Sequence, residues 1–228
     1  MTVAMLLLAG GRGTRFGGVV PKVYVEVAGL TVLERSVRRL AEITPDREIV
    51  LAVHPQDRAT LVAPLLPRLQ AAGLTRVVDG GPTRQASMEL ALAAAGKHTD
   101  LVLVHDAARP FFPVAAAREA LTKAAAVGGA LLAIPAFDTL KRVTPDARVI
   151  ETVPRADIWC AQTPQVARRA DLERAVRHAR ATGFAATDDV SLLEHAGIAV
   201  AVVLGSATNL KLTTKEDLVI AEALARLE

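Results

Sequence analysis

The sequence predicts an α/β protein built on a doubly wound, mostly parallel sheet. Short apolar segments alternate with amphipathic ones along nearly the whole chain, and these short segments are apolar at consecutive positions. Aromatic residues make up only 3% of the composition, so Ala, Val and Leu must fill the interior. Strands that are apolar on both faces are typical of a parallel sheet covered by helices. A length of 228 residues suits one large domain of this kind.

The elements are expected in a regular order. The segments predicted as strands are Val3–Leu8, Glu48–Val53, Arg76–Val78, Leu101–Val104, Gly129–Ile134, Ala199–Leu204 and Asn209–Leu212. The segments predicted as helices are Thr31–Ile43, Asp57–Ala71, Thr83–Ala95, Pro113–Val127, Ala170–Thr182, Asp188–Ala196 and Lys215–Leu227. Thr31 and Glu34 have the spacing of a capping box, which marks the start of the first helix.

One stretch, Phe137–Arg155, departs from this alternation. Its residues alternate between apolar and polar, and Thr144–Ala147 (TPDA) supplies a turn. The pattern predicts a β-hairpin inserted into the α/β domain. Because an isolated hairpin is only marginally stable in water, we expect it to pack on something else, such as a neighbouring subunit. We therefore expect residues 1–228 to form one domain, with a dimerisation arm at about 137–155.

Composition and charge exclude several classes of protein. The net charge is only +3 and no basic run is interleaved with aromatics, which argues against nucleic-acid binding. The first residues, MTVAMLLLAGG, lack a basic region and are far shorter than the ~20 apolar residues that span a bilayer. We expect no membrane association and a cytoplasmic protein. Cys160 is the single cysteine, which excludes an internal disulfide, and we expect it to be a small buried hydrophobe.

The segment Leu8–Lys22 (LAGGRGTRFGGVVPK) predicts a binding site for a nucleoside triphosphate. It follows the first predicted strand, and ligands of open α/β sheets bind beyond the carboxyl ends of the strands. Arg15 and Lys22 supply cations that can neutralise phosphate charge. Three residues free the backbone to bring N–H groups close to a ligand, namely Gly10, Gly11 and Gly13.

Two commoner phosphate-binding loops do not fit this segment. The dinucleotide pattern G-x-G-x-x-G begins at Gly11 and Gly13 but has Phe16 in place of the third glycine. The second predicted strand ends at Val53 and His54, with no acid there to bind a ribose. A Walker A loop requires Gly-Lys followed by Ser or Thr, and neither tripeptide occurs. The remaining interpretation is nucleotidyl transfer.

Five further motifs occur in the chain, at residues 79–87 (DGGPTRQAS), 104–111 (VHDAARPF), 138–142 (DTLKR), 187–189 (TDD) and 209–213 (NLKLT). With the opening loop and Pro21-Lys22, their order and spacing resemble the 2-C-methyl-D-erythritol 4-phosphate cytidylyltransferase family over essentially the whole chain. HDAARP and NLKLT are the most specific parts. The resemblance implies transfer of a cytidylyl group from CTP to 2-C-methyl-D-erythritol 4-phosphate. It also implies a homodimer in which the arm reaches the partner's active site.

The resemblance also implies roles for particular residues. Arg15 and Lys22 would stabilise the transition state, while Arg155, donated across the dimer, and Lys211 would position the incoming phosphate. The alcohol-phosphate pocket would be lined by Asp106, Arg109, Thr139 and Thr187. The nucleotide would be bound by Ala9, Gly10, Gly11, Gly13, Gly81, Arg84 and Ser87, and all of these except Gly13 would surround the cytidine. Arg12 and Pro82-Thr83 depart from the family's usual residues, which affects the detail of the nucleotide contacts.

The proposed reaction does not need a catalytic base, and the sequence offers no obvious set of residues that would supply one. A phosphate monoester has a second pKa of about 6, so this nucleophile is largely dianionic at pH 7 and needs no base. Consistently, no Ser-His-Asp or Cys-His set is evident. Cations and positioning must overcome the repulsion between two anions. We also expect Mg²⁺, held mainly by triphosphate oxygens, and assign it no protein ligand.

Alternative interpretations remain open at this point. Asp106 could accept a substrate hydrogen bond, help to hold the metal or cap a helix, and Thr187 could also be a cap. Arg109 could simply brace its loop, and His105 is expected to be structural. Another polyol phosphate, such as ribitol 5-phosphate, is the rival substrate, and a non-catalytic nucleotide-binding regulator is the rival class.

Overall fold

The computed structural model describes residues 1–11 and 20–227. Within that part of the chain, a seven-stranded sheet has the order β11-β7-β10-β6-β1-β4-β5. Its strands are β1 (Val3–Ala9), β4 (Arg47–Val53), β5 (Arg76–Asp79), β6 (Leu101–Asp106), β7 (Gly129–Pro135), β10 (Trp159–Arg168) and β11 (Val200–Leu204). All neighbouring pairs are parallel except those of β10, which runs antiparallel to β6 and β7. The predicted doubly wound, mostly parallel sheet is therefore confirmed.

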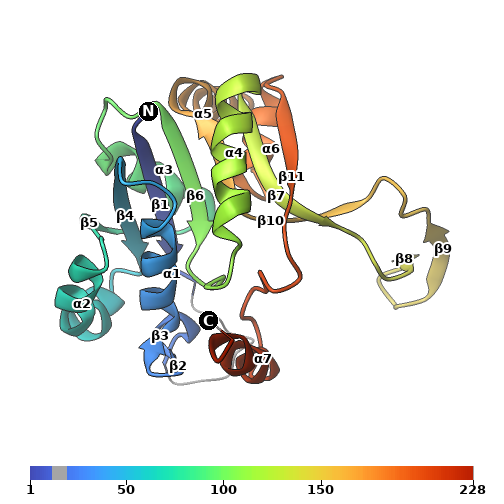
Figure 1. Ribbon diagram of the computed structural model, residues 1–228. Helices are drawn as coiled ribbons and strands as arrows, with labels where there is room; N and C mark the ends of the chain where they lie inside the picture. The colour runs from blue at the N-terminus through green and yellow to red at the C-terminus, as the bar shows by residue number, and fades with distance from the viewer. Residues whose placement is uncertain (12–19, 228) are drawn as a thin grey trace.

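Helices cover both faces of this sheet (Figure 1). Those that contribute to its layers are α1 (Val32–Ala41), α2 (Leu66–Ala71), α3 (Arg84–Ala94), α4 (Val114–Val127), α5 (Arg169–Thr182) and α6 (Asp189–His195). Helices α1, α2 and α4 pack with Met5 and Leu7 of β1, whereas α3, α5 and α6 pack with Leu6 and Leu8. Successive side chains of a strand point to opposite faces. Every residue of β1 is therefore buried, which explains its continuous apolar sequence.

A third apolar cluster lies at the end of the sheet where the carboxyl ends of the parallel strands emerge. There α7 (Glu216–Ala225) packs with the short strands β2 (Glu26–Val27) and β3 (Leu30–Thr31) (Figure 1). Val27, Phe111 and Leu212 are buried in this cluster. It joins three segments that are far apart in the sequence.

The start of α1 differs from the predicted capping box. The Thr31 hydroxyl accepts a hydrogen bond from the Glu34 N–H at 3.1 Å, so the N-cap is as expected. The buried Glu34 carboxylate instead forms ion pairs with Arg38, at 3.0 Å, and with Arg68, at 2.8 Å. Because Arg68 belongs to α2, Glu34 ties the two helices together.

Several predicted elements were wrong in detail. The stretch 57–71 divides into a π-helical turn (Arg58–Val62), a 3-10 turn (Ala63–Leu65) and α2, since Pro64 and Pro67 each remove a helical N–H donor. In the described structure, Asn209–Leu212 has no strand assignment, and its Leu212 N–H donates to the Ala108 carbonyl at 2.9 Å. Strand β10 was not predicted. Cys160, which lies on it, is exposed rather than buried.

The predicted hairpin is present. It pairs β8 (Leu140–Val143) with β9 (Val149–Val153) and extends away from the body of the molecule (Figure 1). The turn closes with a hydrogen bond of 2.9 Å from the Ala147 N–H to the Thr144 carbonyl. Ala147 has a φ of 63°, in the left-handed region that this turn requires. Among the residues that the structure describes, no helix combines the length and apolar character needed to cross a membrane.

Candidate functional site

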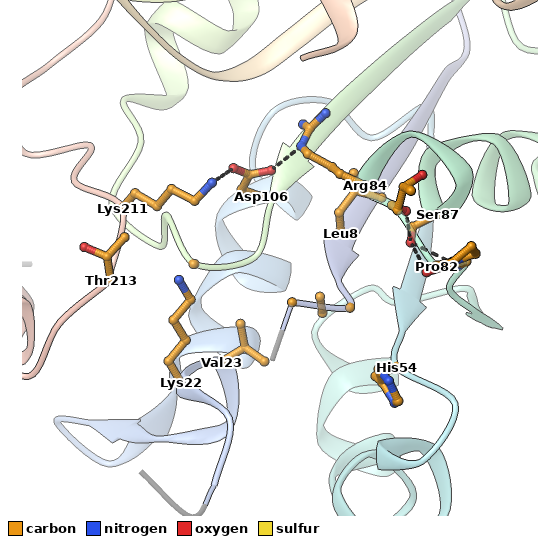
Figure 2. Close-up of a pocket in the computed structure, with 16 residues that line it drawn as sticks. Leu8, Lys22, Val23, His54, Pro82, Arg84, Ser87, Asp106, Lys211 and Thr213 are labelled. Carbon is orange, nitrogen blue, oxygen red and sulfur yellow. Dashed lines mark hydrogen bonds and ion pairs between the residues drawn. The ribbon is translucent and has the colours of Figure 1, made fainter. Parts of the chain in front are cut away.

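A cavity of about 550 Å³ opens beyond the carboxyl ends of β1, β4 and β6 (Figure 2). The position is the one expected for a ligand of an open α/β sheet. Its described lining residues come from segments that are distant in the sequence: Leu8, Ala9, Gly10, Gly11, Lys22, Val23, His54, Gly81, Pro82, Thr83, Arg84, Ser87, Asp106, Ala108, Lys211 and Thr213. A cavity of this size is in the usual range for a small-molecule site.

One wall of the cavity is the turn between β5 and α3. The Ser87 hydroxyl accepts a hydrogen bond from the Gly81 N–H at 3.1 Å and lies 2.9 Å from the Thr83 carbonyl, to which it donates. Thr83 caps α3, because its hydroxyl accepts from the Ala86 N–H at 3.0 Å. A Cβ atom on Gly81 would lie 2.5 Å from the Ala86 Cβ. This close approach explains why position 81 is glycine.

A row of alternating charges extends across the cavity to Arg84, the first residue of α3. The Lys211 ammonium lies 2.7 Å from Asp106 Oδ2, and the Arg84 Nε lies 3.1 Å from Asp106 Oδ1 (Figure 2). Arg84 also contacts Asp189, the first residue of α6, with 2.7 Å between Nη2 and Oδ2. Two cations at the cavity are thus held by carboxylates at fixed positions.

Burial and ion pairing have opposite effects on the pKa values of the charged groups in this row. Burial alone would raise the pKa of Asp106, but the cations of Arg84 and Lys211 outweigh it and hold that pKa well below its usual value. Burial would likewise lower the pKa of Arg84, but Asp189 and Asp106 hold it above its usual value. Burial raises the pKa of Asp189, against the opposing effect of Arg84. Asp106 is therefore ionised at neutral pH and accepts hydrogen bonds.

Asp106 is supported from behind by His105 and Thr163. The Thr163 hydroxyl accepts a hydrogen bond from the Asp106 N–H at 3.1 Å, which leaves its proton free to donate to His105 Nδ1, 2.9 Å away. The other ring nitrogen, Nε2, lies 3.0 Å from the Arg109 carbonyl. A carbonyl can only accept, so the proton of the neutral imidazole must be on Nε2. His105 is fully buried, and burial lowers its pKa to about 3. It is a neutral structural residue, in agreement with the sequence interpretation.

Lys22 also lines this cavity. It begins a short 3-10 turn, Lys22–Tyr24, directly after Pro21. Figure 2 shows its ammonium directed toward the part of the cavity where Asp106 and Lys211 lie. The fold thus brings cations from three separate segments, Lys22, Arg84 and Lys211, to one cavity.

Nine of the predicted site residues line the cavity: Ala9, Gly10, Gly11, Lys22, Gly81, Arg84, Ser87, Asp106 and Lys211. Four others are absent from its described lining. Arg109 braces the loop after β6 by donating to the Asn209 carbonyl at 2.6 Å. Thr139 and Arg155 are exposed on the arm. Thr187 is exposed beside α6, whose N-cap is Asp188 and not Thr187. Gly13 and Arg15 lie outside the described residues.

Sequence reasoning assigned no role to His54, Thr213 or Asp189. His54 and Thr213 line the cavity, and Asp189 fixes Arg84. His54 follows directly after β4, so the rule that sites lie beyond strand ends would have found it. Asp189 gave no such signal, since its pairing with Arg84 joins residues 105 positions apart.

The sheet order, the two helical layers and this cation-rich cavity define the class: the chain is an α/β nucleotidyltransferase. Residues 3–226 match the family described as 2-C-methyl-D-erythritol 4-phosphate cytidylyltransferase. The chain belongs to this family.

Similar proteins cover nearly the whole chain. The enzyme of that name from Symbiobacterium thermophilum is 39% identical over 99% of this chain and 94% of its own length. The enzyme from Bacillus licheniformis is 36% identical over 100% of this chain and 97% of its own. The crystal structure of the Thermus thermophilus enzyme matches 99% of this chain and 100% of its own with a TM-score of 0.81 at 36% identity.

Proposed function

We propose that the protein transfers the cytidylyl group of CTP to 2-C-methyl-D-erythritol 4-phosphate, giving 4-diphosphocytidyl-2-C-methyl-D-erythritol and pyrophosphate. The observation that carries the proposal is the placement of Lys22, Arg84 and Lys211 around one cavity that the glycine turn at Gly81 also lines. Cations and backbone amides are what two phosphate-bearing substrates require. The proposed substrates are those in the names of the full-length relatives.

The reaction needs charge neutralisation more than acid–base chemistry. An oxygen of the acceptor phosphate attacks the α-phosphorus of CTP. The bond from that phosphorus to the α,β-bridging oxygen breaks, and its electron pair leaves with pyrophosphate. The acceptor is largely dianionic at pH 7, so no residue has to remove a proton. Lys22, with Arg15, would stabilise the negative charge that builds up at the α-phosphate.

Lys211 and Asp106 would act on the acceptor. Lys211 is held by Asp106 at 2.7 Å, so its ammonium is positioned before a phosphate arrives. The ionised Asp106 carboxylate can also accept a hydrogen bond from an acceptor hydroxyl group. Contacts of Arg109, Thr139 and Thr187 with the acceptor remain predictions from the family resemblance.

The arm suggests how the site is completed. Arg155 and Thr139 are exposed on an arm that extends away from the body of its own subunit. The arm and its base also expose Phe137, Val149, Ile150 and Trp159, apolar side chains that favour burial against a partner. We therefore propose one domain per chain and a homodimer in which each arm carries Arg155 to the partner's cavity.

A magnesium ion fits this cavity as a companion of the triphosphate. Asp106 is the only carboxylate among the described lining residues, and the described residues contain no cluster of three or more His, Cys, Asp or Glu suited to a metal. Mg²⁺ often takes only one or two carboxylates together with substrate phosphates. Asp106 is the residue that would help to hold it. The ion would neutralise triphosphate charge.

A panel of acceptors tests the proposal. The protein is incubated with CTP, Mg²⁺ and either 2-C-methyl-D-erythritol 4-phosphate or ribitol 5-phosphate, and pyrophosphate release is followed. We expect the higher kcat/KM with the methylerythritol substrate. Faster turnover of ribitol 5-phosphate would overturn the substrate assignment. Tight CTP binding without turnover of any acceptor would indicate a non-catalytic regulator.

A further inference from the structure

Two buried amide side chains, Gln162 and Asn209, form a pair behind the cavity. Asn209 is fully buried and Gln162 is 6% exposed. The Asn209 Nδ2 donates to the Gln162 Oε1 at 3.0 Å and to the Thr163 carbonyl at 2.9 Å. Gln162 lies on β10, whereas Asn209 lies in the segment that follows β11. Neither belongs to the described lining of the cavity.

Backbone partners fix which end of each amide is the donor. The Thr163 carbonyl can only accept, so the Asn209 atom facing it must be nitrogen. The Gln162 Nε2 faces the Ser206 carbonyl at 2.8 Å, so its Oε1 must face the Asn209 Nδ2. A Cβ atom on Gly205 would overlap this Oε1, which explains the glycine there. The two amides therefore interlock in a single orientation.

The pair holds the segment that carries Lys211. At one side of Lys211, Asn209 is fixed by its amide and by Arg109, which donates to the Asn209 carbonyl at 2.6 Å. At the other side, the buried Leu212 donates its N–H to the Ala108 carbonyl at 2.9 Å. Between these two attachments, the Lys211 ammonium reaches Asp106 at 2.7 Å. The location of this cation thus depends on groups outside the cavity.

We propose that Gln162 and Asn209 are positioning residues that set the place of the Lys211 ammonium for the acceptor phosphate. The proposal rests on the proposed cytidylyl transfer. Both residues act through Lys211 and do not touch the substrates. The Asn209 Nδ2 and the Gln162 Nε2 bond the two residues to each other and to two backbone carbonyls, and a buried hydrogen-bonded network of this kind rigidifies the segments that it joins. A shift of about 1 Å in a positioning group can lower a rate about 100-fold.

Asn209→Asp tests the pair with almost no change in shape. It replaces the Asn209 Nδ2 donor by an oxygen, which would face two acceptors, the Gln162 Oε1 and the Thr163 carbonyl. The segment that carries Lys211 must therefore move. We expect kcat/KM for the acceptor to fall about 10-fold to 100-fold, by analogy with other displaced positioning groups, and KM for CTP to change much less. Gly205→Ala should show the same pattern. Thr75→Val is the control, because it removes a partly buried side-chain hydrogen bond to the Ile49 carbonyl, and neither residue belongs to the described lining of the cavity.

A double-mutant cycle with Lys211→Ala separates positioning from general destabilisation. If Asn209 acts through Lys211, Asn209→Asp should cause little further loss in the Lys211→Ala background. An equal loss in both backgrounds would overturn the proposal. So would a loss in the control variant that matches that of Asn209→Asp.

A measurement that does not depend on catalysis can test the positioning role of Asn209 even if the proposed function is wrong. Limited acetylation followed by mass spectrometry reports how accessible the Lys211 ammonium is, with the exposed Lys215 as the internal reference. We expect Asn209→Asp to raise Lys211 labelling, because the ion pair with Asp106 is weakened. Unchanged labelling would overturn the positioning role, whether or not the wild-type protein transfers a cytidylyl group.

Discussion

The Lys211 ammonium lies 2.7 Å from the Asp106 carboxylate, although the two residues are 105 positions apart. Asp106 ends β6 and Lys211 follows β11 at the far edge of the sheet, so the fold must bring them together. The same carboxylate contacts Arg84 at 3.1 Å. Asp106 therefore organises two cations at the cavity before any phosphate binds.

Replacing Lys22 should chiefly lower kcat. Its cation would interact more strongly as charge develops in the transition state, so Lys22→Ala removes an interaction that matters most there. We expect a fall on the order of a hundredfold, with a smaller change in KM for CTP. Steady-state kinetics measure both. Lys215→Ala is the matched control, since Lys215 is exposed and outside the described cavity lining. A similar fall in the control would contradict the role of Lys22.

Arg155→Ala should mainly raise KM for the acceptor, because it removes a cation that would position the incoming phosphate. If Arg155 completes the site of the partner subunit, a mixture of two variants should regain activity. At an acceptor concentration below KM, where both variants have low activity, Lys22→Ala and Arg155→Ala chains are mixed; about half of the dimers are then heterodimers, and each has one intact composite site of two. Activity should therefore recover to about a quarter of the wild-type value. No recovery, despite subunit exchange verified by mass spectrometry, would place Arg155 outside the partner's site.

Gly81→Ala should weaken CTP binding. The new Cβ atom would lie 2.5 Å from the Ala86 Cβ and 3.1 Å from its backbone, so the turn between β5 and α3 must shift. We expect an increase in the Kd for CTP, measured by calorimetry, with only a modest loss of thermal stability. Gly96→Ala is the control, because its nearest neighbour is the end of the Glu48 side chain. Unchanged CTP affinity in Gly81→Ala would show that this turn does not contact the nucleotide.

His105 gives the stability a defined dependence on pH. An unfolded imidazole binds a proton below about pH 6.5, whereas burial lowers the pKa of His105 to about 3 in the folded chain. Between these values the unfolded chain binds more protons, so stability falls as the pH falls. One such group contributes a slope of about 1.4 kcal/mol per pH unit well below pH 6.5. Denaturant unfolding at pH 7, 6 and 5 should show a shallower slope for His105→Gln. Equal slopes would contradict a neutral buried His105.

The sequence predicted the strands whose side chains are apolar on both faces of the sheet. β1, β4, β6 and β7 are continuous apolar segments, and the structure places them as expected. β10 was missed because its buried side chains include Gln162 and Gln165, which read as polar loop residues. Gln162 binds the Ser206 carbonyl, and Gln165 binds Asp188 and the Asp189 N–H. Such partners are visible only in three dimensions.

The same reason explains the incorrect strand at Asn209–Leu212. Its apolar residues suggested a strand, but the buried Asn209 and Leu212 attach it to β10 and to the loop after β6. The opening loop and the motifs at residues 79–87, 104–111 and 209–213 supplied the cavity residues, because each lies at or after the end of a strand, whereas the motifs at 138–142 and 187–189 supplied none of the described lining. The motifs did not reveal that Arg84 is held by Asp106 and Asp189, whereas the bracing of a loop by Arg109 was one of the alternatives that the sequence left open.

Direct identification of the product tests the central claim. The protein is incubated with CTP, Mg²⁺ and 2-C-methyl-D-erythritol 4-phosphate, and the reaction is followed by ³¹P NMR. We expect loss of the acceptor's phosphomonoester signal, growth of two coupled diphosphate signals and release of one pyrophosphate per product. An unchanged phosphomonoester signal, with CTP intact or hydrolysed without transfer, would contradict the central claim.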